Sequence, residues 1–189
     1  MEKVNFRKIL EAQEELNQKY SGEKWKLTVT AEYLRAAIFT EIAEFLESSP
    51  EDWKWWKNIP NDRQNQYIEV VDVVHFGASL MLKYNEIENM NDEFNCIEWG
   101  SVLKRVEDEN IYTLLLEFFN CPNVFNFVVL IQALCLYTKN PLSINEVWNG
   151  YFAKNQLNHN RVDGGYKDGK YQKINENGEE DNRAISFEE

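Results

Sequence analysis

Apolar residues recur along most of the chain at the spacing of one helix face. Six such positions fall within residues 4–19: Val4, Phe6, Ile9, Leu10, Ala12 and Leu16. Similar periodicity predicts further helices at 31–47, from Asp62 to about residue 84, and at about 96–108, 110–119, 124–138 and 143–160. Residues 21–30 and 50–62, which contain Gly or Pro, are predicted as loops, and the polar residues 85–93 are predicted as a linker. The pattern predicts an all-α fold, a helical bundle with its functional site between helices.

Local signals mark some helix ends and a change near the C-terminus. Thr30 can cap the helix that follows it, and Ser-Ser-Pro ends that helix before Pro50. After Arg161 the sequence VDGGYKDGKYQK is Gly-rich and basic, whereas residues 174–189 carry six acids and one Arg. These features predict a single domain over residues 1–173 with a C-terminal flap, followed by a mobile acidic tail at 174–189.

Size and charge narrow the possible classes of protein. The chain has 189 residues, 43% of them hydrophobic, which is enough for one domain with a sizeable core. Its net charge of −12 argues against binding nucleic acid or an anionic membrane through bulk charge. Three widely spaced cysteines without a CxxC motif, and no signal peptide, favour a reduced cytoplasmic protein.

The longest uncharged run, residues 118–138, is long enough to suggest a membrane span. Asn and Gln side chains and Pro122 interrupt it, and polar groups in lipid are costly. A buried or subunit-interface helix is therefore the preferred interpretation, and no membrane association is predicted.

Two pairs of carboxylates lie within strongly apolar helices. TEIAEFLES contains Glu41 and Glu44, and YIEVVDVVHFG contains Glu69 and Asp72, each pair three residues apart on one helix face. One such pair alone is usually a solvated surface, but isolated buried carboxylates are destabilising, and four together repel one another. Divalent cations resolve this, and oxygen ligands without His or Cys select Mg²⁺, Mn²⁺ or Ca²⁺. His75 lies close by but is interpreted as a packing or supporting group.

A carboxylate-bound metal suits a polyphosphate substrate, which needs basic residues for its remaining charge. Cations gather in WKWWKN and in residues 154–173, which carry Lys154, Arg161, Lys167, Lys170 and Lys173. A solvated helix end would explain Arg161, whereas a flap closing over phosphates also explains the Gly-rich continuation.

These segments resemble, in the same order, the motifs of the all-α dimeric dUTPases, part of the superfamily that includes MazG-like pyrophosphohydrolases. The motifs are AQEELN, EIAEFLES, WKWWKN, EVVDVVHFG and KNQLNHNRVDGGYKDGKYQK. The resemblance runs from about residue 9 to residue 173, although residues 85–135 match nothing in the family's pattern.

The resemblance implies Mg²⁺-dependent hydrolysis of dUTP and dUDP to dUMP, with Mn²⁺ as a second candidate cation. Glu41, Glu44, Glu69 and Asp72 would bind the metal, and Glu41 would also deprotonate the water that attacks the α-phosphorus. Phe76, one turn beyond Asp72, would pack against the sugar where a 2′-hydroxyl would otherwise fit.

The resemblance also implies the remaining contacts. Gln13 and Asn17 would face the uracil, with Trp56 nearby. Seven residues would hold phosphates or close over the base: Lys54, Lys57, Lys154, Asn158, Arg161, Tyr166 and Lys173. A homodimer is implied as well, and the apolar helix at 124–138 is the candidate for part of its interface.

Two other interpretations stay open at this point. A related pyrophosphohydrolase, MazG-like or acting on dCTP, would share the acid pairs but differ in the residues around the base. A helical interaction module with a structural cation, or with none, would need no catalytic Glu41.

Overall fold

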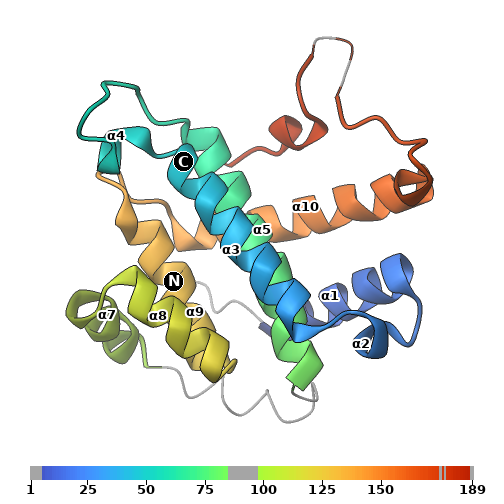
Figure 1. Cartoon of the computed structure of the whole chain (residues 1–189), viewed down its shortest axis with the longest axis horizontal. Coiled ribbons are helices and arrows are strands. Elements are labelled where there is room, and N and C mark those ends of the chain that lie inside the picture. Colours follow the sequence, from blue (N-terminus) through green and yellow to red (C-terminus); the bar gives the residue numbers. More distant parts are fainter. Residues whose placement is uncertain (1–5, 85–97, 175, 177, 188–189) are drawn as a thin grey trace.

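The fold is an all-α bundle, as the sequence predicts. The computed structural model describes residues 6–84, 98–174, 176 and 178–187, so the predicted linker at 85–93 lies outside the described residues. Within these ranges the only β-type pairing is an isolated bridge between Ile174 and Glu180. Helices α3 (Ala31–Glu47) and α5 (Arg63–Tyr84) run side by side through the middle of the molecule (Figure 1).

Helix α3 has the predicted bounds and the predicted cap. The Thr30 side chain accepts a hydrogen bond of 3.2 Å from the backbone N–H of Tyr33, which satisfies one free donor at the helix start. The flanking segments are more helical than predicted, with short helices α2 (Trp25–Thr28) and α4 (Pro50–Trp53). Trp25 is fully buried, and Pro50 supplies a φ angle suited to a first helical position.

Helix α5 is buried along most of its length because it is apolar on nearly every face. Helices α1 (Phe6–Ser21), α10 (Ile144–Asp163) and α9 (Val124–Tyr137) pack against it. A Cβ atom at Gly77 would lie 2.2 Å from the Phe127 ring, so glycine permits the close approach of α9. This arrangement leaves the two acidic residues of α5 between the bundle's helices.

Two side-chain hydrogen bonds join the end of α3 to the start of α5. Asn65 donates to the hydroxyl of Ser48 at 2.6 Å, and Gln66 donates to the hydroxyl of Ser49 at 3.0 Å. Both donors and both acceptors lie at the ends of the helices that carry the acid pairs. The contacts therefore hold the two acidic motifs in a fixed mutual register.

Helix α9 forms part of the core. Helices α7 (Trp99–Asp108) and α8 (Ile111–Asn120) cover it together with α5, and nearly all its apolar side chains are buried. Burial within the chain therefore accounts for most of α9, whereas a contribution to a subunit interface, for which its exposed Leu136 is available, stays a prediction. Among the described helices, none combines the length and the continuous hydrophobicity that a transmembrane segment requires.

The acidic C-terminal segment folds back onto the bundle (Figure 1). Arg183 forms an ion pair of 2.6 Å with Asp62, before α5, and Phe187 stacks on Tyr67 with ring centroids 4.7 Å apart. Its acidic composition therefore does not prevent residues 181–187 from packing on the bundle. The mobility predicted for the tail stays a prediction.

Candidate active site

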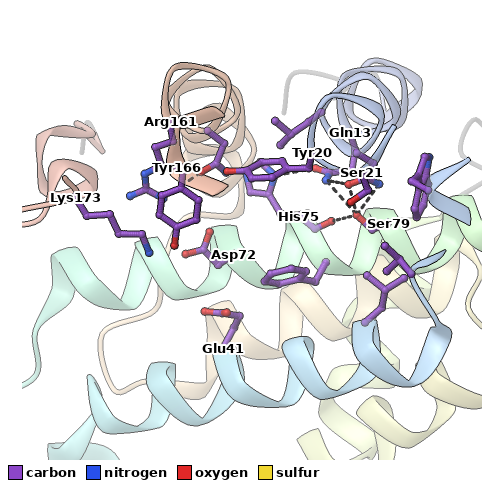
Figure 2. A pocket seen from close by; sticks show the side chains of 17 residues that line it. Gln13, Tyr20, Ser21, Glu41, Asp72, His75, Ser79, Arg161, Tyr166 and Lys173 are labelled. Atoms are coloured by element: carbon purple, nitrogen blue, oxygen red, sulfur yellow. Dashed lines mark hydrogen bonds between the residues drawn. The ribbon is translucent and has the colours of Figure 1, made fainter. Parts of the chain in front are cut away.

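Three of the four predicted acidic residues meet between α3 and α5. Glu41 comes from α3, and Glu69 and Asp72 come from α5. Each offers a carboxylate oxygen, and these three atoms lie within 4.8 Å of one another. Figure 2 shows Glu41 and Asp72 facing each other from the two helices.

The cluster has a strong tendency to hold protons. Burial, followed by the charges of Asp72 and Glu44, raises the pKa of Glu41 to about 7. The pKa of Glu69 is raised to about 8 by burial and by the charges of Asp72, Glu41 and Glu44. Near neutral pH, carboxyl groups in this position are therefore partly neutralised by protons unless another cation is present.

Two neighbouring donors partly compensate this charge. Lys154 on α10 is buried, and its Nζ lies 2.9 Å from Oδ2 of Asp72. Asn65 donates a hydrogen bond of 2.8 Å to Oε1 of Glu69. The ammonium group of Lys154 supplies one positive charge, whereas the cluster has three carboxyl groups and a fourth nearby on Glu44. The site therefore has a net negative charge.

The donor set fits a hard divalent cation. All three clustered residues offer oxygen ligands, which Mg²⁺ and Mn²⁺ prefer, and the like charges that raise the pKa values would be neutralised by such an ion. Glu44 is exposed and lies outside the group of three, although its charge raises the pKa of both glutamates. Its role as a fourth ligand stays a prediction.

A pocket of about 400 Å³ opens beside the carboxylates. Glu41 and Asp72 lie in its wall, and Phe76, one turn beyond Asp72 on α5, lies there too and is half-buried. Leu16, Val29 and Leu34 contribute apolar surface. The pocket is therefore mixed in character, with acidic groups beside an aromatic and aliphatic wall.

One end of the pocket is formed by an amide network (Figure 2). Gln13 Nε2 donates to Asn17 Oδ1 at 3.0 Å and to Ser79 Oγ at 3.1 Å. Gln13 Oε1 lies 2.8 Å from Nδ1 of His75 and 3.1 Å from the hydroxyl of Tyr151. These bonds fix the orientation of the Gln13 amide, which is buried.

His75 is a neutral supporting group. Burial and then the charges of Lys154 and Arg161 hold the pKa of His75 well below its ordinary value. Because Gln13 Oε1 can only accept a hydrogen bond, the proton of His75 lies on Nδ1. The buried Nε2 has no hydrogen-bond partner within the described structure.

Cationic and polar side chains form another part of the pocket wall. Arg161, Asn158, Tyr166 and Lys173 all line it, and the Nζ of Lys173 lies 5.2 Å from the centroid of the Tyr166 ring. Figure 2 shows Arg161, Tyr166 and Lys173 on the side of the pocket near Asp72. The predicted basic flap therefore lies beside the carboxylate cluster.

Three predicted ligand contacts lie away from this pocket. Lys54 forms an ion pair with Glu47, while Trp56 and Lys57 are exposed in the loop after α4. None of the three lines the pocket. The loop's aromatic rings contact one another instead, with Trp56 packed edge-on against its neighbours Trp53 and Trp55.

The pocket also contains residues that sequence reasoning did not select. Tyr20 lies seven residues after Gln13, and Ser79 lies three after Phe76, so helical spacing places each on the face of a selected residue. The helical spacing could therefore have identified Tyr20 and Ser79 as pocket residues from the sequence alone. Trp25 gave no such signal, because it belongs to a short helix in a segment predicted as a loop.

Comparison with known proteins identifies the family of the chain. A search of curated proteins gives no match. The family model described as dUTPase matches residues 5–166, a range that includes the amide network, the acidic cluster and all of α10. An all-helical fold with acidic residues between two helices agrees with the all-α dUTPases, and dUTP diphosphatase activity follows from this match. The chain belongs to the dUTPase family.

Proposed function

We propose that the chain hydrolyses dUTP to dUMP and pyrophosphate in a Mg²⁺-dependent reaction at this pocket. The observation that supports it best is the proximity of a carboxylate cluster, a basic segment and an amide network around one cavity. In this proposal the phosphates lie between the carboxylates and Arg161, and the deoxyuridine lies toward Gln13 and Asn17. Mn²⁺ is the second candidate cation.

Glu41, Glu69 and Asp72 would hold the cation, with Glu44 as a further ligand. When bound, the metal neutralises phosphate oxygens and makes an adjacent water more acidic. Glu41 Oε accepts a proton from the attacking water, whose oxygen forms a bond to the α-phosphorus. The bond from that phosphorus to the bridging oxygen breaks, and pyrophosphate leaves with the electron pair.

The other residues hold and enclose the substrate. Arg161, Lys173 and Lys154 supply positive charge near the carboxylates, while Asn158 and Tyr166 complete that wall. Phe76 packs against the deoxyribose, where a 2′-hydroxyl would be left without a hydrogen-bond partner. The predicted contacts of Lys54, Trp56 and Lys57 would require their loop to approach the pocket.

Hydrolysis of dUDP is part of the same proposal. The bond that breaks joins the α- and β-phosphates, so the chemistry needs only two phosphates and releases phosphate instead of pyrophosphate. A homodimer is also proposed, and the exposed side chains of Tyr33 and Phe39 on α3 offer apolar surface for it. The cytoplasmic location stays a prediction from the cysteine pattern.

The test is release of pyrophosphate from dUTP, dTTP, dCTP and UTP, each with and without Mg²⁺. The proposal predicts fast release from dUTP alone and only in the presence of the metal. Equal hydrolysis of all four would favour a related pyrophosphohydrolase with another base preference. Metal-independent hydrolysis would contradict the role of the carboxylates.

A further inference from the structure

The C-terminal segment beyond the family match contacts the pocket wall from outside. Residues 167–187 follow the matched region, and within them Asp181 lies against the guanidinium group of Arg161. Arg161 Nε donates to Asp181 Oδ2 at 3.1 Å, and Arg161 Nη2 donates to Asp181 Oδ1. The carboxylate therefore binds the guanidinium at two points, a geometry that fixes its plane.

Asp181 also joins the basic flap to the tail. The hydroxyl of Tyr171 donates to Asp181 Oδ2 at 2.8 Å, and the backbone N–H of Asp181 donates to the carbonyl of Lys173 at 2.8 Å. The end of α10, the flap and the tail thus meet at one carboxylate. The tail is anchored again further along, where Arg183 pairs with Asp62.

The ion pair leaves part of Arg161 available to a ligand. A guanidinium group has five N–H donors, and toward the described residues Arg161 uses three of them, two for Asp181 and one from Nη1 to Asn158 Oδ1 at 3.1 Å. Arg161 and Asn158 line the pocket, whereas Asp181 is not one of its lining residues. Asp181 therefore supports Arg161 from behind and does not occupy the place of a ligand in the pocket.

The ion pair between Arg161 and Asp181 compensates two charges that would each be costly to bury alone. Arg161 is only 6% exposed, and burial alone would penalise its positive charge. The hydrogen bonds and charge of Asp181 outweigh that effect and raise the pKa of Arg161. Burial likewise disfavours the charge of Asp181, but Arg161 and Tyr171 hold the pKa of Asp181 below its ordinary value.

We infer that Asp181 is a positioning residue: it orients the guanidinium group of Arg161, and with it the flap at Lys173, toward the phosphates of a bound nucleotide. This inference rests on the proposed function. It adds a residue outside the matched family region to the site. Asp181 acts through Arg161 and touches no substrate itself.

The test compares Asp181→Asn with Glu176→Gln, which makes the same change of charge at an exposed position of the tail. Isothermal titration in Mg²⁺ measures affinity for a non-hydrolysable α,β-imido dUTP and for deoxyuridine. Loss of a charged hydrogen-bond partner predicts about tenfold or more weaker binding of the triphosphate by Asp181→Asn. Binding of deoxyuridine stays unchanged, and Glu176→Gln matches the parent protein.

A double-mutant cycle of Asp181 and Arg161 distinguishes orientation of the guanidinium group from a general effect of the substitution on the fold. In an Arg161→Gln background, Asp181→Asn should cause no further loss of triphosphate affinity, because the group that it orients is gone. If Asp181→Asn does not fold, Tyr171→Phe removes one hydrogen bond to the same carboxylate and should weaken triphosphate binding to a smaller degree. Unchanged or tighter triphosphate binding, or equal loss for triphosphate and deoxyuridine, would overturn the inference.

Measurements on the unsubstituted parent protein show whether a negative result concerns the role of Asp181 alone or the proposed function as a whole. If the parent hydrolyses dUTP with Mg²⁺ while Asp181→Asn binds the analogue normally, only the role of Asp181 is wrong. If the parent neither binds the analogue nor hydrolyses dUTP, the proposed function is wrong, and the role of Asp181 with it.

Discussion

The ammonium group of Lys154 lies 2.9 Å from the carboxylate of Asp72, which links α10 to the acidic cluster between α3 and α5. Lys154 is almost fully buried, so water screens this ion pair only weakly. In the metal-free protein it supplies the nearest compensating charge to carboxyl groups that repel one another. Cation binding and protein stability should therefore be linked at this site.

Lys154→Met should destabilise the metal-free protein by about 1–3 kcal/mol, because Asp72 loses a charged hydrogen-bond partner. Mg²⁺ should reduce this loss, since the ion neutralises the same carboxylates. Urea denaturation with and without Mg²⁺ measures both quantities. An equal loss of stability in the two conditions would separate Lys154 from the cation site.

The raised pKa values predict that the metal-free protein becomes less stable as pH rises. Glu41 and Glu69 hold protons up to about pH 7 and about pH 8, above the ordinary value of 4.5, so between these limits the folded state binds more protons than the unfolded chain. The stability that these protons provide is complete below about pH 4.5 and is lost as pH rises toward 8.

Glu69→Gln should flatten this dependence and raise the melting temperature of the metal-free protein at pH 8. Each kcal/mol of relieved repulsion corresponds to about 2–4 °C for a chain of this size. Melting curves from pH 5 to 8 in a chelator provide the measurement. A metal-free parent protein that becomes steadily more stable over this range would contradict the electrostatic description of the cluster.

Glu41→Gln should reduce turnover of dUTP by at least about 100-fold, the usual contribution of a positioned general base. Its fold should persist, because an amide replaces a carboxyl group that already tends to be protonated. Steady-state kinetics and circular dichroism check the two parts of this prediction. Strong residual activity in a folded variant would remove Glu41 from the role of base.

Phe76→Ala should relax discrimination between dUTP and UTP by about tenfold, because it opens space beside the sugar and lets water reach a 2′-hydroxyl. The ratio of kcat/KM for the two nucleotides is the relevant measurement. Leu16→Ala, elsewhere in the pocket wall, provides the matched control and should leave the ratio unchanged. Equal ratios in the parent and Phe76→Ala proteins would mean that the ring has only a packing role.

The sequence was most informative in α3, where the same helical spacing predicts both which residues are buried and where Glu41 lies. Helix α3 buries Leu34, Ile38 and Phe45, and Glu41 lies three residues after Ile38 and four before Phe45, on the face that meets α5. Glu44 is offset from that face and remains exposed. A spacing of three residues makes two acids neighbours, but helix packing decides which of them points inward.

Long-range contacts were not predictable from local sequence. The Trp-rich loop is positive and aromatic, yet Lys54 pairs with Glu47 and the loop lies away from the pocket. The C-terminal segment is acidic, yet single residues such as Phe187 attach it to α5 through a stacked ring. Composition describes the average character of a segment, whereas these positions depend on individual partners far away in the sequence.

The most direct test of the central claim is a crystal structure with Mn²⁺ and α,β-imido dUTP, measured for anomalous scattering. The claim predicts an anomalous peak at about 2.1 Å from carboxylate oxygens of Glu41, Glu69 and Asp72, with phosphate oxygens completing the coordination. Peaks elsewhere, in crystals of an active enzyme with bound nucleotide, would contradict it.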